Sequence, residues 1–226
     1  MTTLIAEDLL LLFLDDDSGA TNTVVPIPTV LGGAILIELA VAGAVEVPER
    51  TSVWKTAKVR PVPGARVEDP LLVEALATVA EKERTAQDLV GKLGRGTRER
   101  LAARLVERGI LEHRKDRVLG LFPRTRWPVV DSRHEDEVRR ALTDVLVLDA
   151  EPDPRTGALV ALLAATDRAH KVVDRGNRSA REVRKRAKTI SEGAWAAKAV
   201  RDALSASTAA ITAATTTAAV AGTSGS

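Results

Sequence analysis

A basic turn in the middle of the chain has residue types and spacing suited to binding a phosphate group. Gly94, Arg95, Gly96, Thr97 and Arg98 stand together directly before and within the start of a predicted helix. The first turn of a helix offers free backbone N–H groups and a positive dipole end, which both favour an anion. Arginines three residues apart can direct their forked guanidinium groups at one phosphate. The turn therefore predicts an anion site, although a solvated basic face fits the pattern as well.

Positive charge is concentrated around this turn. Residues 84–126 contain twelve bases and five acids, whereas residues 1–30 contain five acids and no base. A second basic segment, residues 168–188, contains nine bases and two acids, and the net charge of +2 conceals this asymmetry. Two functions fit the first segment. Residues 85–124 could form a winged-helix unit that binds DNA, or the phosphate could belong to a lipid head group. The charge pattern does not separate them.

Other combinations of reactive side chains give weak signals. His113, His134 and His170 are scattered, and no set of His, Asp and Glu has metal-ligand spacing. Asp167 and His170 could meet on one helix face, but such a pair is more often a structural hydrogen bond than an acid–base pair. The three aspartates of residues 15–17 lack the pattern of a calcium loop. We therefore expect no catalytic residue, no metal and no cofactor.

The longest apolar run, residues 30–47, predicts a helix at the centre of the core. It is apolar on nearly every side and is interrupted by one charge, Glu38. A membrane span needs about 20 apolar residues without such a charge. We expect Gly43 to end this helix. Because a buried charge without a partner is costly, we expect an Arg or Lys elsewhere to hold Glu38.

Caps, prolines and glycines divide the rest of the chain. The predicted helices span residues 3–14 with Thr2 or Thr3 as N-cap, 70–83 after an Asp69 cap, 85–94, 97–108, 132–149, 159–173, a basic helix from 179, and 192–210. Residues 45–47 and 57–62 are predicted to pair as strands, and residues 110–121 to form two strands joined at 115–116. Prolines predict an extended loop over residues 21–29 and a turn over 152–157.

These elements predict a mainly α fold in a single globular domain, residues 1–211. Central apolar helices, residues 30–43 and 159–173, are ringed by amphipathic helices, and a small β-hairpin is added. Residues 212–226 are rich in Ala, Thr, Gly and Ser and are expected to form a flexible tail. Only 2% of the residues are aromatic, which makes a base-stacking platform unlikely. Without cysteine or a basic leader, we expect a cytoplasmic protein.

Several stretches together resemble the Golgi phosphoprotein 3 family. LIAEDLLLLFLDDDSG is similar to the family's first helix and turn, and GGAILIELAVAGAVEV to its central helix. DPLLVEAL, RERLAARLVERGIL, DRVLGLFPRTRWPV and ALVALLAATDRAHKVV resemble later elements, in family order over about residues 3–205. LIELA combined with RERLA…LVE.GIL is the specific part. The abundance of Ala and of Arg over Lys suggests a bacterial member.

The resemblance implies a helical, non-enzymatic domain that binds phosphatidylinositol 4-phosphate on a basic, membrane-facing surface. Two head-group arginines of the family fall on Arg95 and Arg98. The family's pocket tryptophan falls near Thr23, however, and a further arginine falls on Gly32. Half of the family's pocket is therefore replaced, which leaves the identity of the head group open.

The resemblance also implies that the hairpin aids membrane contact and self-association. The candidate membrane contacts are Arg114, Lys115, Arg117 and Trp127, although packing is the commoner fate of a tryptophan. We expect a peripheral membrane protein in the cytoplasm, bound to phosphoinositide or another anionic phospholipid. It could form homo-oligomers through the hairpin. DNA would be its partner only if the segment 85–124 were a winged helix.

Overall fold

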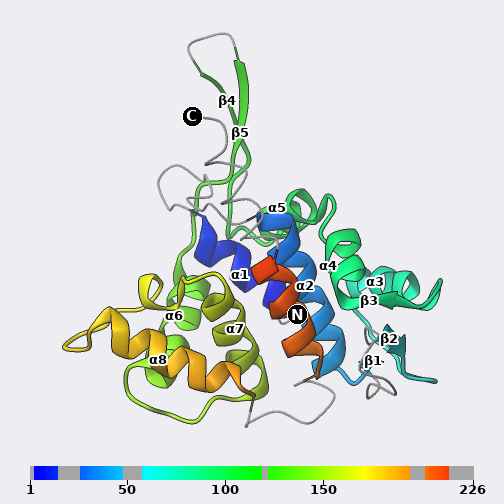
Figure 1. The fold of residues 1–226 in the computed structure, drawn as a ribbon. Helices are drawn as coiled ribbons and strands as arrows, with labels where there is room; N and C mark the ends of the chain where they lie inside the picture. Colours follow the sequence, from blue (N-terminus) through cyan, green and yellow to red (C-terminus); the bar gives the residue numbers. More distant parts are fainter. Residues whose placement is uncertain (1–2, 15–25, 48–57, 119–121, 194–201, 214–226) are drawn as a thin grey trace, which may run out of the picture.

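The computed structural model describes every residue except 1–2, 15–25, 48–57, 119–121, 194–201 and 214–226. Its helices are α1 (Ile5–Phe13), α2 (Ile27–Val41), α3 (Pro70–Ala80), α4 (Ala86–Leu93), α5 (Thr97–Glu107), α6 (Arg133–Leu146), α7 (Pro154–Ala165) and α8 (Ala180–Ser191), with the 3₁₀ turn η1 (Ala169–Lys171). Residues 202–213 are also helical. The strands are β1 (Val45–Glu46), β2 (Lys58–Pro61), β3 (Arg84–Thr85), β4 (Arg114–Val118) and β5 (Phe122–Arg126). The fold is mainly α, as predicted (Figure 1).

Helix α2 lies at the centre of the described helices, as the apolar run predicts. It packs against α1, α4, α5 and α7, so α2 and α7 are the adjacent central helices that the sequence predicts (Figure 1). Gly43 adopts a φ of +67° directly after the helix, which confirms it as the stop signal. The helix begins earlier than expected, because Pro26 is the N-cap and Pro28 lies in the first turn. The first turn of a helix needs no N–H group for its internal hydrogen bonds, so it accepts proline. The extended loop predicted over residues 21–29 is therefore wrong for residues 27–29, and its part over 21–25 lies outside the described residues.

The backbones of α2 and α4 approach each other closely through two glycines. A Cβ atom on Gly32 would lie 2.0 Å from the carbonyl oxygen of Val90, and one on Gly94 would lie 1.9 Å from that of Pro28. No side chain fits at either position without moving a backbone. This contact fixes the end of α4, and with it the turn that leads into α5.

Helix α1 begins differently from the prediction. Its N-cap is Leu4, whose N–H group donates to Oε2 of Glu7 at 2.7 Å. Thr3 does not cap the helix, because its hydroxyl lies 3.1 Å from Nε2 of His134. The N–H group of Ile5 donates to Oε2 of Glu38 at 2.7 Å. Two carboxylates therefore satisfy the first N–H groups of α1.

The β-strands form two small antiparallel units. Strands β1, β2 and β3 make one sheet in that order, and the pairing of residues 45–46 with 60–61 confirms the predicted hairpin. Strands β4 and β5 make the second unit, in which Arg114 is the partner of Arg126 and Val118 of Phe122. The prediction of two strands joined at 115–116 is wrong, because both of those residues lie within β4.

Helix α7 also differs from its predicted span of 159–173. Asp153 accepts hydrogen bonds from the N–H groups of Arg155 and Thr156, and Pro154 is the first helical residue. The prolines that predicted a turn over residues 152–157 therefore start a helix instead. The helix ends at Ala165, and Asp167 has a positive φ of 51°.

Candidate functional site

The basic turn lies where α4 passes into α5. Gly96 has a φ of +67° and is the N-cap of α5, but it has no side chain to cap the helix. The hydroxyl of Thr97 donates to the carbonyl of Leu93, so it does not cap α5 either. The first turn of α5 therefore keeps backbone donors that no side chain of the turn occupies. This is the helix start that the sequence predicts.

Most of the basic side chains in and around α4 and α5 form an ion pair with a carboxylate. Arg84 and Lys92 pair with Glu81, at 2.8 Å and 2.6 Å, and Arg100 pairs with Glu74 at 2.8 Å. Further along α5, Arg104 and Arg108 contact the buried carboxylate of Glu7. Within the described part of the chain, the two remaining bases of α4, α5 and the turn between them contact no carboxylate. They are Arg95 and Arg98.

Arg98 lies against an aromatic ring. The carbon at the centre of its guanidinium group lies 5.0 Å from the ring centroid of Trp127, within the range of a cation–π contact. The indole ring is in turn stacked on His113, with 6.5 Å between centroids. The Nε atom of Arg98 is buried and has no hydrogen-bond partner among the described residues. Trp127 is only 9% exposed, so in this conformation it supports Arg98 rather than facing outward.

Arg95 directly precedes Gly96, the N-cap of α5, and is exposed. It lines a shallow hollow of about 90 Å³ together with Lys92, Thr97 and Arg100, next to α3. Arg98 is not among the residues that line this hollow. The structure thus brings both predicted arginines to the start of α5 but gives them different neighbours.

The β4–β5 hairpin projects from the helices near the start of α5 (Figure 1). Arg114 is exposed and pairs with Glu112 at 2.8 Å. Lys115 and Arg117 lie in β4, opposite Thr125 and Pro123. The hairpin adds positive residues to the same end of the molecule, and its contact with a membrane stays a prediction.

A network of buried carboxylates was not foreseen from the sequence. Glu7 is fully buried, and its two oxygens accept from Arg104 at 2.8 Å and from Arg108 at 3.2 Å. Arg104 also donates to Asp69, the N-cap of α3, at 2.9 Å. These contacts raise the pKa of Arg104 further above its already high ordinary value, and the hydrogen bond to Asp69 is the largest cause. Two arginines of the basic helix are therefore internal ties between α1, α3 and α5.

The other half of the network surrounds Asp8. Arg155 of α7 donates to Oδ2 of Asp8 at 2.6 Å and to Oε1 of Glu38 at 3.3 Å, which confirms the expected cationic partner of Glu38. His134 places Nε2 at 2.8 Å from Asp8 and 3.1 Å from Thr3. A nucleophile triad uses the two different ring nitrogens for these contacts, so this arrangement is not one. The hydrogen bond to Asp8 raises the pKa of His134.

The remaining candidates have structural partners. His170 lies 3.7 Å from Asp167, but Arg184 holds that carboxylate at 2.7 Å and 3.0 Å. Burial and the charge of Arg184 lower the pKa of His170. In the described residues, no group of three or more His, Cys, Asp or Glu side chains could hold a metal ion.

The sequence predicts that two pocket residues of the family are replaced in this chain, and the structure describes one of these two positions. Gly32 is buried at the contact of α2 with α4, so an arginine has no room there. Thr23 lies outside the described residues.

The fold and the site together define a helical domain with an arginine-bearing turn beside a projecting basic hairpin. None of the helices in the described ranges is both long and apolar enough to cross a bilayer. The model of the Golgi phosphoprotein 3 (GPP34) family matches residues 5–207. The chain therefore belongs to the Golgi phosphoprotein 3 family. A search of the curated proteins finds no match.

Proposed function

We propose that this protein is a non-enzymatic peripheral membrane protein that binds anionic phospholipid head groups at the start of α5. Phosphatidylinositol 4-phosphate and similar phosphoinositides are the lipid class that family membership suggests. One observation carries the proposal. Among the bases of α4, α5 and the turn between them, Arg95 and Arg98 contact no carboxylate of the described chain, whereas Lys92, Arg100 and Arg104 do.

The surroundings of Arg98 suit a phosphate ligand. Its guanidinium group is held over Trp127, so little side-chain freedom is lost when an anion binds. No carboxylate of the described chain pairs with Arg98, so the terminal N–H groups of its guanidinium group remain to donate to a phosphate. The free N–H groups and the dipole of α5 favour the same anion.

The β4–β5 hairpin would support this site by its charge. Each Lys or Arg near an anionic leaflet contributes about 1 kcal/mol of attraction. Lys115 and Arg117 lie in the strand that projects from the helices, close to the end of the molecule that carries the turn (Figure 1). We propose that the hairpin contacts the membrane surface while the turn binds one head group.

The exposed face of α5 argues against DNA as the partner. A winged-helix protein inserts its recognition helix into the major groove, where basic residues meet the phosphates. The exposed residues of α5 are Glu99, Arg100, Ala103 and Glu107, and Arg100 already pairs with Glu74. Arg104 and Arg108 are directed to Glu7 in the interior. A helix that presents carboxylates to DNA phosphates would be repelled.

Vesicle co-sedimentation tests the site. Each charge-assisted hydrogen bond contributes about 1.5–3 kcal/mol, so Arg95→Ala and Arg98→Ala should each weaken binding to phosphatidylinositol 4-phosphate vesicles about tenfold or more. Because both arginines would bind one anion, the double variant should lose less than the sum of the two. With the Gly32 position unable to carry an arginine, we expect weak selectivity among phosphoinositides.

Arg100→Ala is the matched control, since Arg100 lies on the same helix turn and already pairs with Glu74. Its vesicle binding should change less than threefold or so, as expected for an exposed ion pair. Equal and additive losses at all three positions would mean a diffuse basic face without a head-group site. A sequence-selective DNA gel shift without vesicle binding would support the winged-helix function instead.

A further inference from the structure

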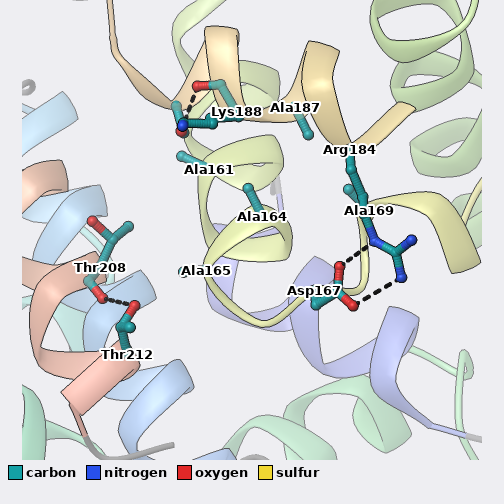
Figure 2. Close-up of a pocket in the computed structure, with 11 residues that line it drawn as sticks. Ala161, Ala164, Ala165, Asp167, Ala169, Arg184, Ala187, Lys188, Thr208 and Thr212 are labelled. Carbon is teal, nitrogen blue, oxygen red and sulfur yellow. Dashed lines mark hydrogen bonds and ion pairs between the residues drawn. The ribbon is translucent and has the colours of Figure 1, made fainter. Parts of the chain in front are cut away.

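A second hollow lies far from the arginine turn, between α7, α8 and the helix of residues 202–213. Its volume is about 330 Å³, which falls in the range of small-molecule sites. Figure 2 shows Thr208 and Thr212 facing Ala161 and Ala165 across it. The hollow is partly open to solvent, so a ligand could enter it from the surface without displacing a helix.

The hollow exists because the helices that surround it carry small side chains. α7 contributes Ala161, Ala164 and Ala165, and α8 contributes Ala187. The hydroxyl of Thr208 donates to the carbonyl of Leu204 at 2.9 Å, within its own helix. The walls thus consist mainly of methyl groups and offer few free polar partners, which suits an acyl chain rather than a sugar or a nucleotide.

The rim of the hollow is positively charged. Asp167 and Arg184 both line it, but they bind each other through two hydrogen bonds of 2.7 Å and 3.0 Å and leave no net charge (Figure 2). Lys188 also lines it and contacts no carboxylate within the described chain. Arg181 and Lys185 continue this charge along the exposed face of α8.

We propose that this hollow binds a single-chain anionic amphiphile, with the acyl chain along the alanines and the anionic head at Lys188. The two parts of such a molecule match the two parts of the site: apolar methyl walls and one uncompensated ammonium group. A free fatty acid and a lysophospholipid with an anionic head share this chemistry. The site is separate from the head-group site at α5 and uses the second basic segment of the chain.

Binding of cis-parinaric acid to the full-length protein tests this proposal, because the fluorescence of this fatty acid rises in apolar surroundings. Ala164→Phe places a ring in the hollow and should weaken binding at least about tenfold. Ala164 is only partly buried, so the variant should fold. Ala165→Leu fills the same hollow from the next position of α7. Circular dichroism melting identifies any variant that has unfolded.

The charge is tested separately. Lys188→Gln should weaken binding about three- to tenfold through the loss of one charged contact. Lys185→Gln is its matched control, because it removes the same charge from the same helix but lies outside the hollow, and its binding should stay unchanged. Losses that are equal for Lys188→Gln and Lys185→Gln would contradict a defined head-group contact.

Displacement of bound parinaric acid by other lipids shows which anionic head group the hollow prefers. Palmitate and lysophosphatidylglycerol carry a carboxylate and a phosphate, and stronger displacement by either one supports the proposal and names the head group. Palmityl alcohol and lysophosphatidylcholine are the uncharged and zwitterionic counterparts. Equal displacement by these counterparts would overturn the proposal. So would a failure of parinaric acid to bind the natural protein, or binding to Ala164→Phe and Ala165→Leu that is as tight as to the natural protein.

Discussion

Gly32 and Gly91 lie on two packed helices but have opposite surroundings. A Cβ atom at Gly32 would meet the carbonyl oxygen of Val90 at 2.0 Å, whereas one at Gly91 would meet nothing within 4 Å. The first position needs glycine for close approach of two backbones, and the second does not. A single added methyl group should therefore have opposite effects at the two positions.

Gly32→Ala should lower the free energy of unfolding by about 3 kcal/mol, near the upper end of the cost of overpacking, because the obstacle is backbone. Gly91→Ala should raise it by about 0.5–1 kcal/mol, since alanine reduces the freedom of the unfolded chain and favours the helix. Urea denaturation of both variants measures the difference. Similar values for the two would mean that α2 and α4 do not approach as described.

The roles of individual arginines could be predicted only in part. The spacing of Arg95 and Arg98 at a helix start identifies them as candidates, and they are the bases of α4, α5 and the turn between them that contact no carboxylate in the described chain. Arg104 is also an arginine and lies on the same helix as Arg98, yet it donates a hydrogen bond to Glu7, which is 97 positions away in the sequence. This contact joins residues that are far apart in the chain. The residues around Arg104 therefore cannot show whether it binds a ligand or a buried carboxylate.

At the scale of elements, local signals predicted most helix ends. Asp69 and Thr85 cap their helices through side-chain hydrogen bonds, and Ser179 forms a capping box with Glu182. Gly109 has a φ of +71° directly after α5, as its predicted stop requires. These contacts join residues within three or four positions, which is why the sequence reveals them.

The predicted positions of other elements are wrong because the same residues can indicate two different structures. Asp153 before Pro154 starts α7 in the same way that Asp69 before Pro70 starts α3, but neighbouring Pro152 and Gly157 indicate a turn. The apolar side chains of Ile110 and Leu111 are typical of a strand, so the sequence predicts the hairpin several residues too early. Leu111 instead forms a single bridge to Val129 at the base of the hairpin.

The hairpin gives a prediction at this scale. Replacing both Lys115 and Arg117 with Gln should weaken binding to anionic vesicles about thirtyfold, because each base contributes about 1 kcal/mol near the membrane surface. The fold should persist, since the hairpin projects from the helices (Figure 1). Vesicle co-sedimentation at physiological ionic strength measures the loss.

The matched control is the double variant of Arg181 and Lys185 to Gln on α8, which removes the same net charge. In Figure 1, α8 lies away from the end of the molecule that carries the hairpin. We expect this variant to keep most of its binding to phosphatidylinositol 4-phosphate vesicles. If both double variants lost the same affinity, net charge rather than the hairpin would determine binding.

At the scale of the whole molecule, buried carboxylates connect most of the helices. Glu7 joins α1 to α5, Asp8 joins α1 to α6 and α7, and Glu38 joins α2 to α1 and α7. The side chain of Glu38 is 12% exposed, and its burial raises its pKa to about 7, against the opposing effects of Arg155 and the Ile5 N–H group. Ionisation of Glu38 therefore lowers the free energy of unfolding.

This gives a prediction for the pH dependence of stability. The pKa of Glu38 is about 7 in the folded protein and 4.5 as its ordinary value, so the folded state binds the proton more tightly. The stabilisation is complete below about pH 4.5 and is lost as the pH rises through 7. Between pH 5 and pH 8 the natural protein should lose roughly 2–3 kcal/mol relative to Glu38→Gln.

Urea denaturation of both proteins at several pH values measures this difference. His134 has a raised pKa too, but it is present in both proteins and cancels in the comparison. A difference that stays constant between pH 5 and pH 8 would show that Glu38 ionises at its ordinary value.

The position of α1 also has a consequence for the order of folding during synthesis. α1 is translated before α5 and α7, since Arg104 follows Glu7 by 97 residues and Arg155 follows Asp8 by 147. Until those cations emerge, burying the two carboxylates of α1 would leave charges without partners, which is strongly unfavourable. We therefore expect the nascent chain to keep α1 in water until α7 has been made. The interior of this domain then closes late, around a helix that is translated well before its partners.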